Sequence, residues 1–434
     1  MKKFILLALA AAVVTSASAE GYQVNTLSAK QLGMAHTGVS QKLNSESVWF
    51  NPAAAAYQEQ KFTIAGGVTG INAVATYRGA DGVTYESDNK LSTPLYLSAN
   101  YKVNDNLALG LVFNTPFGSS MNWGDNWAGM SEVQSISLSA YNVQPTVSYK
   151  LLDGKLSVGA GLMISWGSFE LSKSLINQST AATLDYGYSS TYGSGLDVAT
   201  ATLSGDAAIS FGVNIGIMYD INDKWSLGAS YRSEMKMAVN EGKTELNFGN
   251  AAGRNIIEAG DTSGQTAQLL AIMENNTFAA ELPMPSTLSI GATYYPTEKW
   301  TVSAEWQMVG WSTYETLEFD YDVYQSTATK DYDNTMIYRL GAEYKALDWL
   351  SARGGIYYDE SPVQDEYFTP ETPSMNKMGY TCGLSFMPCK NLSIDLAYAY
   401  IIPASYNRTS TYSAFEGTYR AVANTFSVGA SWGF

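Results

Sequence analysis

The sequence has very little of the side chains on which metal centres and imidazole-based catalysis depend. Its 434 residues include two cysteines and a single histidine. Zinc clusters, iron–sulfur clusters and catalytic schemes with several imidazoles all need more cysteine or histidine than this. We therefore expect no metal site, no cofactor and no enzymatic activity.

Positive charge is also scarce. Lysine and arginine number 25 against 40 aspartates and glutamates, so the formal net charge is −15. A nucleic-acid partner is not expected, because such binding relies on basic side chains that neutralise phosphates. Only 15% of the residues are charged, whereas 30 are tyrosine, 15 phenylalanine and 10 tryptophan. This composition is too aromatic and too weakly charged for an ordinary cytosolic protein.

The chain has no apolar run long enough to cross a bilayer as a helix, which takes about 20 residues. Its longest run, residues 4–14, follows two lysines and precedes the small residues Ala17, Ser18 and Ala19. This pattern predicts a signal peptide over residues 1–19 and export of the chain. An exported chain without a spanning helix can enter a membrane only as a closed β-barrel.

From residue 61 onward, strand-length segments alternate between apolar and polar residues. Six short connections of turn-forming residues lie at 103–106, 152–155, 220–223, 296–299, 346–349 and 388–391. Seven longer ones lie near 78–92, 116–134, 173–203, 240–283, 315–333, 360–376 and 403–420. Thirteen connections join fourteen strands, so residues 61–434 are predicted to form an all-β, antiparallel transmembrane barrel whose short turns face the periplasm.

The alternation also predicts which face meets lipid. Apolar residues such as Trp225, Leu227 and Tyr231 share one face, and the charged residues between them share the other. A soluble sandwich has the same period, but aromatic residues near strand ends, such as Trp300 and Trp349, indicate the interfacial belts of a membrane barrel. The last strand alternates up to a terminal Phe, which resembles the signal read by the outer-membrane assembly machinery. We therefore expect the outer-membrane assembly machinery and outer-membrane lipid to be partners of this protein.

Residues 20–60 do not alternate in this way. They contain Leu32-Gly33-Met34-Ala35 and, further on, Asn51, Pro52 and Ala53. Here the chain resembles the FadL/TodX family of outer-membrane transporters for long-chain fatty acids and other hydrophobic compounds. In that family an N-terminal plug with an Asn-Pro-Ala motif fills a fourteen-stranded barrel. The resemblance implies that residues 20–60 are a plug.

The likeness continues at Thr115-Pro116-Phe117-Gly118, at Glu281-Leu282-Pro283 and around Arg353. Where the family has a Pro-Asp-x-Asp-Arg-like run, this chain has residues 373–377, in which both acids are missing and Lys377 replaces the arginine. The resemblance implies a lateral opening in the third strand, at Pro116, Phe117 and Gly118. Proline suits such an opening, because it cannot donate to the strand ladder. Alternatively, Pro116 ends the strand.

Two long loops are apolar where exposed loops are usually polar. By resemblance to the family, they are expected to form a ligand groove; the alternative is that they only pack the loops together. The candidate groove residues are Trp123, Trp127, Leu269, Leu270, Met273 and Phe278.

Four cations lie on the predicted inward face, where they could bind a ligand carboxylate. They are Arg353, Arg339, Arg232 and Lys236. Arg353 is the first choice, because it lies in the stretch that best matches the family. At the family's other lumen cation position this chain has Ser168. Structural ion pairs with lumen acids such as Glu343, Glu305 or Asp395 are the alternative for each cation.

Together these features predict passive uptake of hydrophobic small molecules across the outer membrane. Long-chain fatty acids are the favoured ligands, and aromatic hydrocarbons suit the same apolar route. One rival is an adhesin-like barrel whose long loops bind a partner. A second is a barrel lipid hydrolase, which the position of the single histidine, His36, in the plug disfavours.

Overall fold

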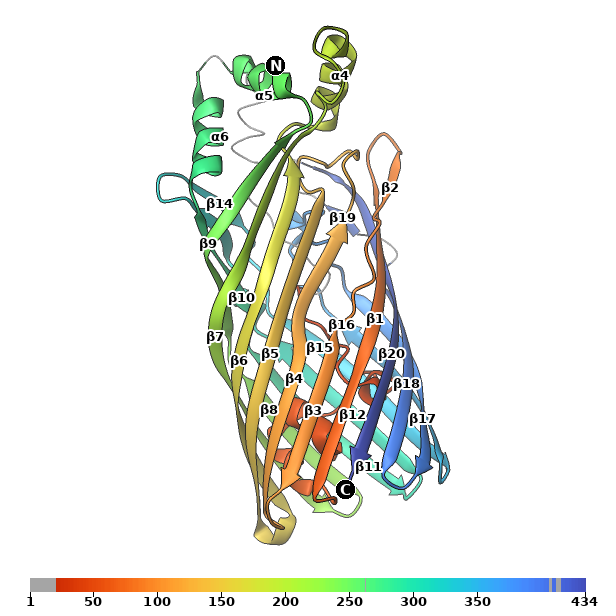
Figure 1. Cartoon of the computed structure of the whole chain (residues 1–434). Coiled ribbons are helices and arrows are strands. Elements are labelled where there is room, and N and C mark those ends of the chain that lie inside the picture. The colour runs from red at the N-terminus through yellow and green to blue at the C-terminus, as the bar shows by residue number, and fades with distance from the viewer. Residues whose placement is uncertain (1–20, 262, 406–407, 411–414) are drawn as a thin grey trace.

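The alternating segments form a closed antiparallel sheet in the computed structural model, which describes residues 21–261, 263–405, 408–410 and 415–434 (Figure 1). The predicted signal peptide, residues 1–19, lies outside the described residues. The first strand, β1 (Phe62–Arg78), pairs with the last, β20 (Gly417–Gly433), and this seam closes the barrel.

Within the described residues the wall has fourteen barrel strands, as predicted. Between β1 and β20 they are β3 (Leu95–Lys102), β4 (Leu107–Asn122), β5 (Ser135–Leu151), β6 (Leu156–Ser174), β7 (Ala199–Asn222), β8 with β9 (Trp225–Arg232, Met235–Phe248), β10 with β11 (Phe278–Met284, Thr287–Thr297), β12 (Trp300–Val309), β15 (Thr335–Leu347), β16 (Leu350–Asp359), β17 (Lys377–Cys389) and β18 (Leu392–Pro403). The six short turns lie where the sequence predicts them, and we call that end of the barrel the turn end.

The opposite end, the loop end, carries the remaining elements. They are β2 (Thr84–Glu86), β13 (Thr316–Asp320), β14 (Gln325–Thr329), β19 (Arg408–Ser410), α4 (Gln178–Tyr192), α5 (Ala251–Gly260), α6 (Gln265–Asn275), and the short turns of helix Trp311–Thr313 and Asp365–Tyr367. Two loops begin later than predicted, because β4 continues past Pro116 to Asn122 and β9 continues to Phe248. No helix in the described ranges is both long and apolar enough to cross a membrane.

The outer surface of the barrel is apolar. Leu111, Ile215, Leu340 and Val428 each keep about half of their surface exposed, and they lie on different strands around the wall. A protein surrounded by water rarely exposes so many large apolar side chains together. This surface is suited to contact with lipid chains.

Residues 21–60 lie inside the barrel, most of them toward the turn end, while residues 22–24 reach β4 nearer the loop end (Figure 1, red). They form α2 (Ala29–Leu32), η1 (Asn44–Glu46), α3 (Ser47–Phe50) and η2 (Pro52–Tyr57). The wall has glycine where this segment approaches most closely: a Cβ at Gly216 would collide with Asn51, and one at Gly228 with the Val39 carbonyl. Close approach therefore depends on the absence of a side chain there. The boundaries at residues 19 and 60 stay a prediction.

Candidate functional site

The predicted groove residues lie at the loop end and are largely covered. The Trp123 and Trp127 rings stack with their centroids 4.6 Å apart, and Trp127 also contacts Phe415. Leu270 and Met273 of α6 are buried, and Phe278 lies against Phe319. All six predicted groove residues except Leu269, which is partly buried against the others, belong to one buried hydrophobic cluster that we call the loop-end cluster. A groove between the loops stays a prediction, and it requires the loops to part.

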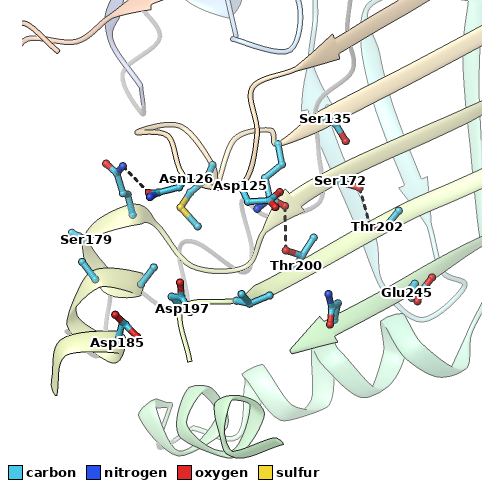
Figure 2. A pocket seen from close by; sticks show the side chains of 17 residues that line it. Asp125, Asn126, Ser135, Ser172, Ser179, Asp185, Asp197, Thr200, Thr202 and Glu245 are labelled. Carbon is cyan, nitrogen blue, oxygen red and sulfur yellow. Dashed lines mark hydrogen bonds between the residues drawn. The ribbon is translucent and has the colours of Figure 1, made fainter. Parts of the chain in front are cut away.

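A cavity of about 820 Å³ beside α4 is polar instead (Figure 2). Four carboxylates line it together with amides and hydroxyls, and no lysine or arginine does. The acids are Asp125, Asp185, Asp197 and Glu245. Apolar ligands prefer pockets lined mainly by hydrophobic side chains. This cavity is therefore poorly suited to a hydrophobic molecule.

The loop between β16 and β17 folds inward and carries buried charge. The Glu371 side chain is fully buried, and no described residue meets the usual hydrogen-bond geometry at its two carboxylate oxygens, although the Thr369 side chain lies close by. Burial raises the pKa of Glu371, while the nearby ammonium of Lys330 opposes the rise. Lys330 is itself buried, and burial lowers its pKa. Nothing in the polar sequence of this loop indicates that it lies inside the barrel.

The wall is incomplete between β1 and the loop-end half of β4. Since β3 begins only at Leu95, the β4 residues 117–122 have β5 on one side and no barrel strand on the other. Their free edge is met from inside by the N-terminal segment: the Val24 amide donates to the Pro116 carbonyl, and the Gly118 amide to the Tyr22 carbonyl, both at 2.8 Å.

Pro116 itself lies in a bulge and does not end the strand. Asn114 pairs with Asn142 and Phe117 with Ala140, so β4 has one residue more than β5 at this point. A bulge tolerates the missing proline N–H. The alternative that Pro116 ends the third strand is therefore wrong.

A cavity of about 560 Å³, which we call the wall pocket, occupies this incomplete part of the wall. Tyr357 and Lys377, both buried in the lumen, line one part of it. Leu91 and Leu95, which are 60% and 41% exposed on the outside, line another. Phe117 and Gly118 also line it.

Asn51, Pro52 and Ala53 are buried where the N-terminal segment meets β7. The Asn51 side chain accepts a bond from the Ala53 amide at 3.0 Å and thereby caps η2, with Pro52 at the first helical position. Its amide nitrogen donates to the carbonyls of Val39 at 2.7 Å and Ile217 at 3.1 Å. The motif thus fixes a turn and ties it to the wall.

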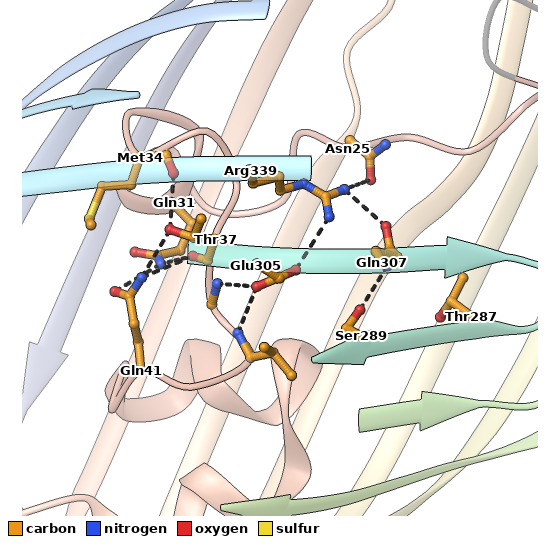
Figure 3. Close-up of polar contacts among 12 residues, drawn as sticks. Asn25, Gln31, Met34, Thr37, Gln41, Thr287, Ser289, Glu305, Gln307 and Arg339 are labelled. Carbon is orange, nitrogen blue, oxygen red and sulfur yellow. Dashed lines mark hydrogen bonds and ion pairs between the residues drawn. The ribbon is translucent and has the colours of Figure 1, made fainter. Parts of the chain in front are cut away.

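Arg339 links β15 to β12 and to the N-terminal segment (Figure 3). Its guanidinium donates to Glu305 at 3.3 Å and to Gln307 at 2.9 Å. The other carboxylate oxygen of Glu305 accepts bonds from the amides of Gly38 and Val39, at 2.8 and 3.0 Å. Arg339 and Glu305 therefore serve to hold the N-terminal segment.

Arg353, the first choice for a ligand carboxylate, already has two acidic partners. It pairs with Glu343 at 2.5 Å and with Asp395 at 3.4 Å, and its side chain is 3% exposed. A ligand would have to displace a neighbouring carboxylate to reach it. The geometry favours the alternative of a structural ion-pair network.

The prediction that Lys236 faces the lumen is wrong. Lys236 is exposed on the outside, where its ammonium lies 2.8 Å from the Glu281 carboxylate. The seventh barrel strand breaks at residues 233–234, and Met235 and Met237 are the buried residues beyond the break. A break that shifts the alternation by one residue moves every later side chain to the opposite face.

Arg232 differs from the other three cations, because no carboxylate of the described residues lies within ion-pair distance of it, although Glu305 acts on its charge from farther away. Its guanidinium donates to the Trp49 carbonyl and, at 3.4 Å, to the Thr287 hydroxyl. It lies 4.0 Å above the Trp49 ring, and its buried Nε has no hydrogen-bond partner within the part of the chain that the structure describes. Across the described residues, none of the ion pairs includes Arg232.

The family described as outer membrane protein transport protein (OMPP1/FadL/TodX) matches residues 10–434. The chain belongs to this family. A long-chain fatty acid transport protein of Escherichia coli O6:H1 is 27% identical over 99% of this chain and 96% of its own length. A Pseudomonas aeruginosa FadL homologue of known structure has a TM-score of 0.77 at 18% identity, covering 95% of this chain and 100% of its own. The toluene transporter TodX of Pseudomonas putida has a TM-score of 0.67 at 16% identity, covering 96% and 99%.

Membership of the OMPP1/FadL/TodX family places the chain in the outer membrane and among transporters rather than enzymes. The rival hypothesis of a lipid hydrolase is therefore set aside. Within this family fold, Pro116, Phe117 and Gly118 lie together beside the wall pocket. The four predicted cations do not share one site, since two are paired within the lumen, one is outside and one is unpaired.

Proposed function

We propose that this protein carries hydrophobic small molecules passively across the outer membrane and releases them sideways into the bilayer through the wall pocket. The observation that carries the proposal is the wall pocket itself, whose lining includes both buried lumen residues and exposed lipid-facing residues. Relatives named for long-chain fatty acids and for toluene suggest ligands of this kind.

A gap in a membrane barrel is costly, because an unsatisfied backbone group facing lipid costs several kcal/mol. Here part of the free edge of β4 is satisfied from the lumen side by residues 22–24, and Asn122 at its end bonds to Asp88 and Asn89. The gap therefore exposes fewer bare amides and carbonyls than an edge without these contacts would. A ligand that leaves through it passes beside a hydrogen-bonded edge.

The N-terminal segment supports a sideways route for a second reason. Asn51 and Glu305 fasten residues 21–60 to the wall near the turn end. As a plug, this segment blocks the straight path to the periplasm. Ligands would reach the lumen at the loop end by parting the groove residues around Trp127 and Leu270.

Filling the wall pocket tests the proposal. A Cβ at Gly118 would already lie 3.7 Å from Val24 and 3.3 Å from the Leu138 carbonyl. The rest of an arginine side chain at this position would therefore extend into the wall pocket, which Gly118 lines. We expect Gly118→Arg to abolish uptake of a radiolabelled fatty acid into outer-membrane vesicles. Heat-modifiable migration should persist, because the sheet pairing with β5 is unchanged.

The matched control is Gly187→Arg on α4, where a Cβ meets nothing within 4 Å. This variant should transport normally. Straightening the bulge with Pro116→Val should reduce uptake in the same direction as Gly118→Arg. Normal uptake by both β4 variants would mean that the ligand leaves through the turn end, and the lateral route would have to be abandoned.

A further inference from the structure

The wall pocket differs from an ordinary apolar cavity, because threonine and serine side chains line much of it. On the outer side the lining includes the exposed Leu91 and Leu95. It also includes Thr26 and Thr425, which are 7% and 0% exposed. Among the described residues that line the pocket, none is acidic. The pocket therefore joins an apolar outer side to a buried part with uncharged polar groups.

Two of the buried hydroxyls have no partner. The Oγ1 atoms of Thr26 and Thr425 make no hydrogen bond within the described part of the chain. A hydroxyl that is buried without a hydrogen bond is destabilising, so such groups in a folded protein call for an explanation. Since the surrounding protein supplies no partner, the partner has to come from the pocket that both residues line. Water or a polar atom of a ligand would meet this need.

The two threonines come from different segments that meet at the gap in the wall. The Thr26 carbonyl accepts a hydrogen bond from the Thr69 hydroxyl of β1 at 3.1 Å, and the Thr69 hydroxyl lies 2.8 Å from the Ser427 hydroxyl. Ser427 follows Thr425 by two residues on β20, and residues two apart on a strand share one face. Thr26 and Thr425 therefore occupy neighbouring positions on the inner side of the wall pocket.

The charged residues of the lining are Lys90 and Lys377. The Lys90 side chain is exposed, so water solvates its charge. Lys377 is buried, and its strand partner on β16 is the buried Asp359. A carboxylate is thus available to match the charge of Lys377. The buried hydroxyls, rather than a free cation, are the unused polar groups of this pocket.

We propose that the wall pocket binds hydrophobic molecules that carry an uncharged oxygen group, such as an alcohol or a ketone, and that Thr26 and Thr425 hydrogen-bond this oxygen. The inference rests on the proposed uptake function and names a substrate class for the same pocket. A threonine hydroxyl can donate and accept, so it suits both groups. A pure hydrocarbon would displace water from these hydroxyls without replacing its hydrogen bonds, which lowers affinity.

The test compares decan-1-ol with decane, which have the same chain length and differ by one hydroxyl. Binding of each tritiated probe to the full-length protein in detergent is measured against protein-free micelles, for the wild type and for Thr425→Val. Valine has the shape of threonine without the hydroxyl, so the variant should still show heat-modifiable migration. We expect it to bind decan-1-ol about two- to tenfold more weakly and decane no more weakly, as loss of one neutral hydrogen bond predicts.

Two further variants sharpen the test. Thr26→Val should act in the same direction as Thr425→Val, because its hydroxyl is also buried and unpartnered in the described chain. Thr425→Ser keeps the hydroxyl and should retain most of the affinity for decan-1-ol. The matched control is Thr329→Val on β14, an exposed position that does not line the pocket, and it should leave both affinities unchanged.

Equal losses of alcohol and alkane in Thr425→Val, or no change in either, would overturn the inference and leave the uptake proposal intact. Wild-type protein that binds decane but not decan-1-ol would overturn it in the same way. Wild-type protein that binds neither probe would refute the uptake proposal itself.

Discussion

The two ends of the lumen are held together by different forces. Toward the turn end, the N-terminal segment is fixed by directional polar contacts such as those of Asn51 and Glu305, and it fits against wall glycines. Toward the loop end, Trp127, Leu270 and Phe278 belong to a large apolar cluster, in which contacts between hydrophobic side chains predominate beside a few hydrogen bonds such as that from the Trp127 indole to the Val133 carbonyl. Hydrogen bonds weaken steeply with misalignment, whereas apolar contact is non-directional. The turn end should therefore be rigid, and the loop end able to rearrange.

The largest loss of stability is expected when the turn end loses a buried charge. Arg353→Met removes the ion-pair partner of the buried Asp395, and it leaves the mostly buried Glu343 with Lys30 as its nearby cation. Breaking such a network costs about 3–5 kcal/mol, so the free energy of unfolding in urea should fall by about that amount. Adding Glu343→Gln and Asp395→Asn should restore part of it. A fall of less than about 1 kcal/mol would show that the lumen solvates these acids well.

An intermediate effect is expected for Asn51→Ala, which removes the η2 cap and the bond to the Ile217 carbonyl. The substitution is expected to destabilise the N-terminal segment by about 1–3 kcal/mol and to leave the sheet unaffected. Hydrogen exchange of the amides in residues 51–57 should accelerate, and conductance for small ions in planar bilayers should increase. Asn275→Ala, at an exposed position of α6, is the control and should change neither. Unchanged conductance in Asn51→Ala would remove the plug role from residues 21–60.

The smallest effect on stability is expected for a volume-conserving substitution at the loop end. Leu270 is fully buried in the loop-end cluster, and Leu270→Met keeps its volume. The free energy of unfolding should change by less than about 1.5 kcal/mol, and ligand uptake should be retained. Loss of uptake with normal stability would show that this end is as tightly specified as the turn end.

The strand count could be predicted because alternation and turn chemistry are local properties of the sequence. The orientation of Lys236 could not, since the break at residues 233–234 carries no distinctive residue, and only the apolar Met235 and Met237 hint at the changed face. That lumen acids such as Glu343 and Asp395 pair with a cation could be predicted from the inward face that they share with it, but which cation they meet is set by register across the sheet. The inward fold of the loop around Glu371 depends on packing between distant segments, which a polar local sequence conceals.

The backbone bonds between residues 22–24 and β4 also constrain the order in which the barrel can assemble. These residues lie inside a wall that is complete only when β1 joins β20, near the two ends of the described chain. Contacts between distant parts of a sequence form late, because the entropy of closing so long a loop must be overcome first. The N-terminal segment is therefore expected to dock on β4 while the β1–β20 seam is still open. Closing that seam would then enclose the segment in the finished barrel.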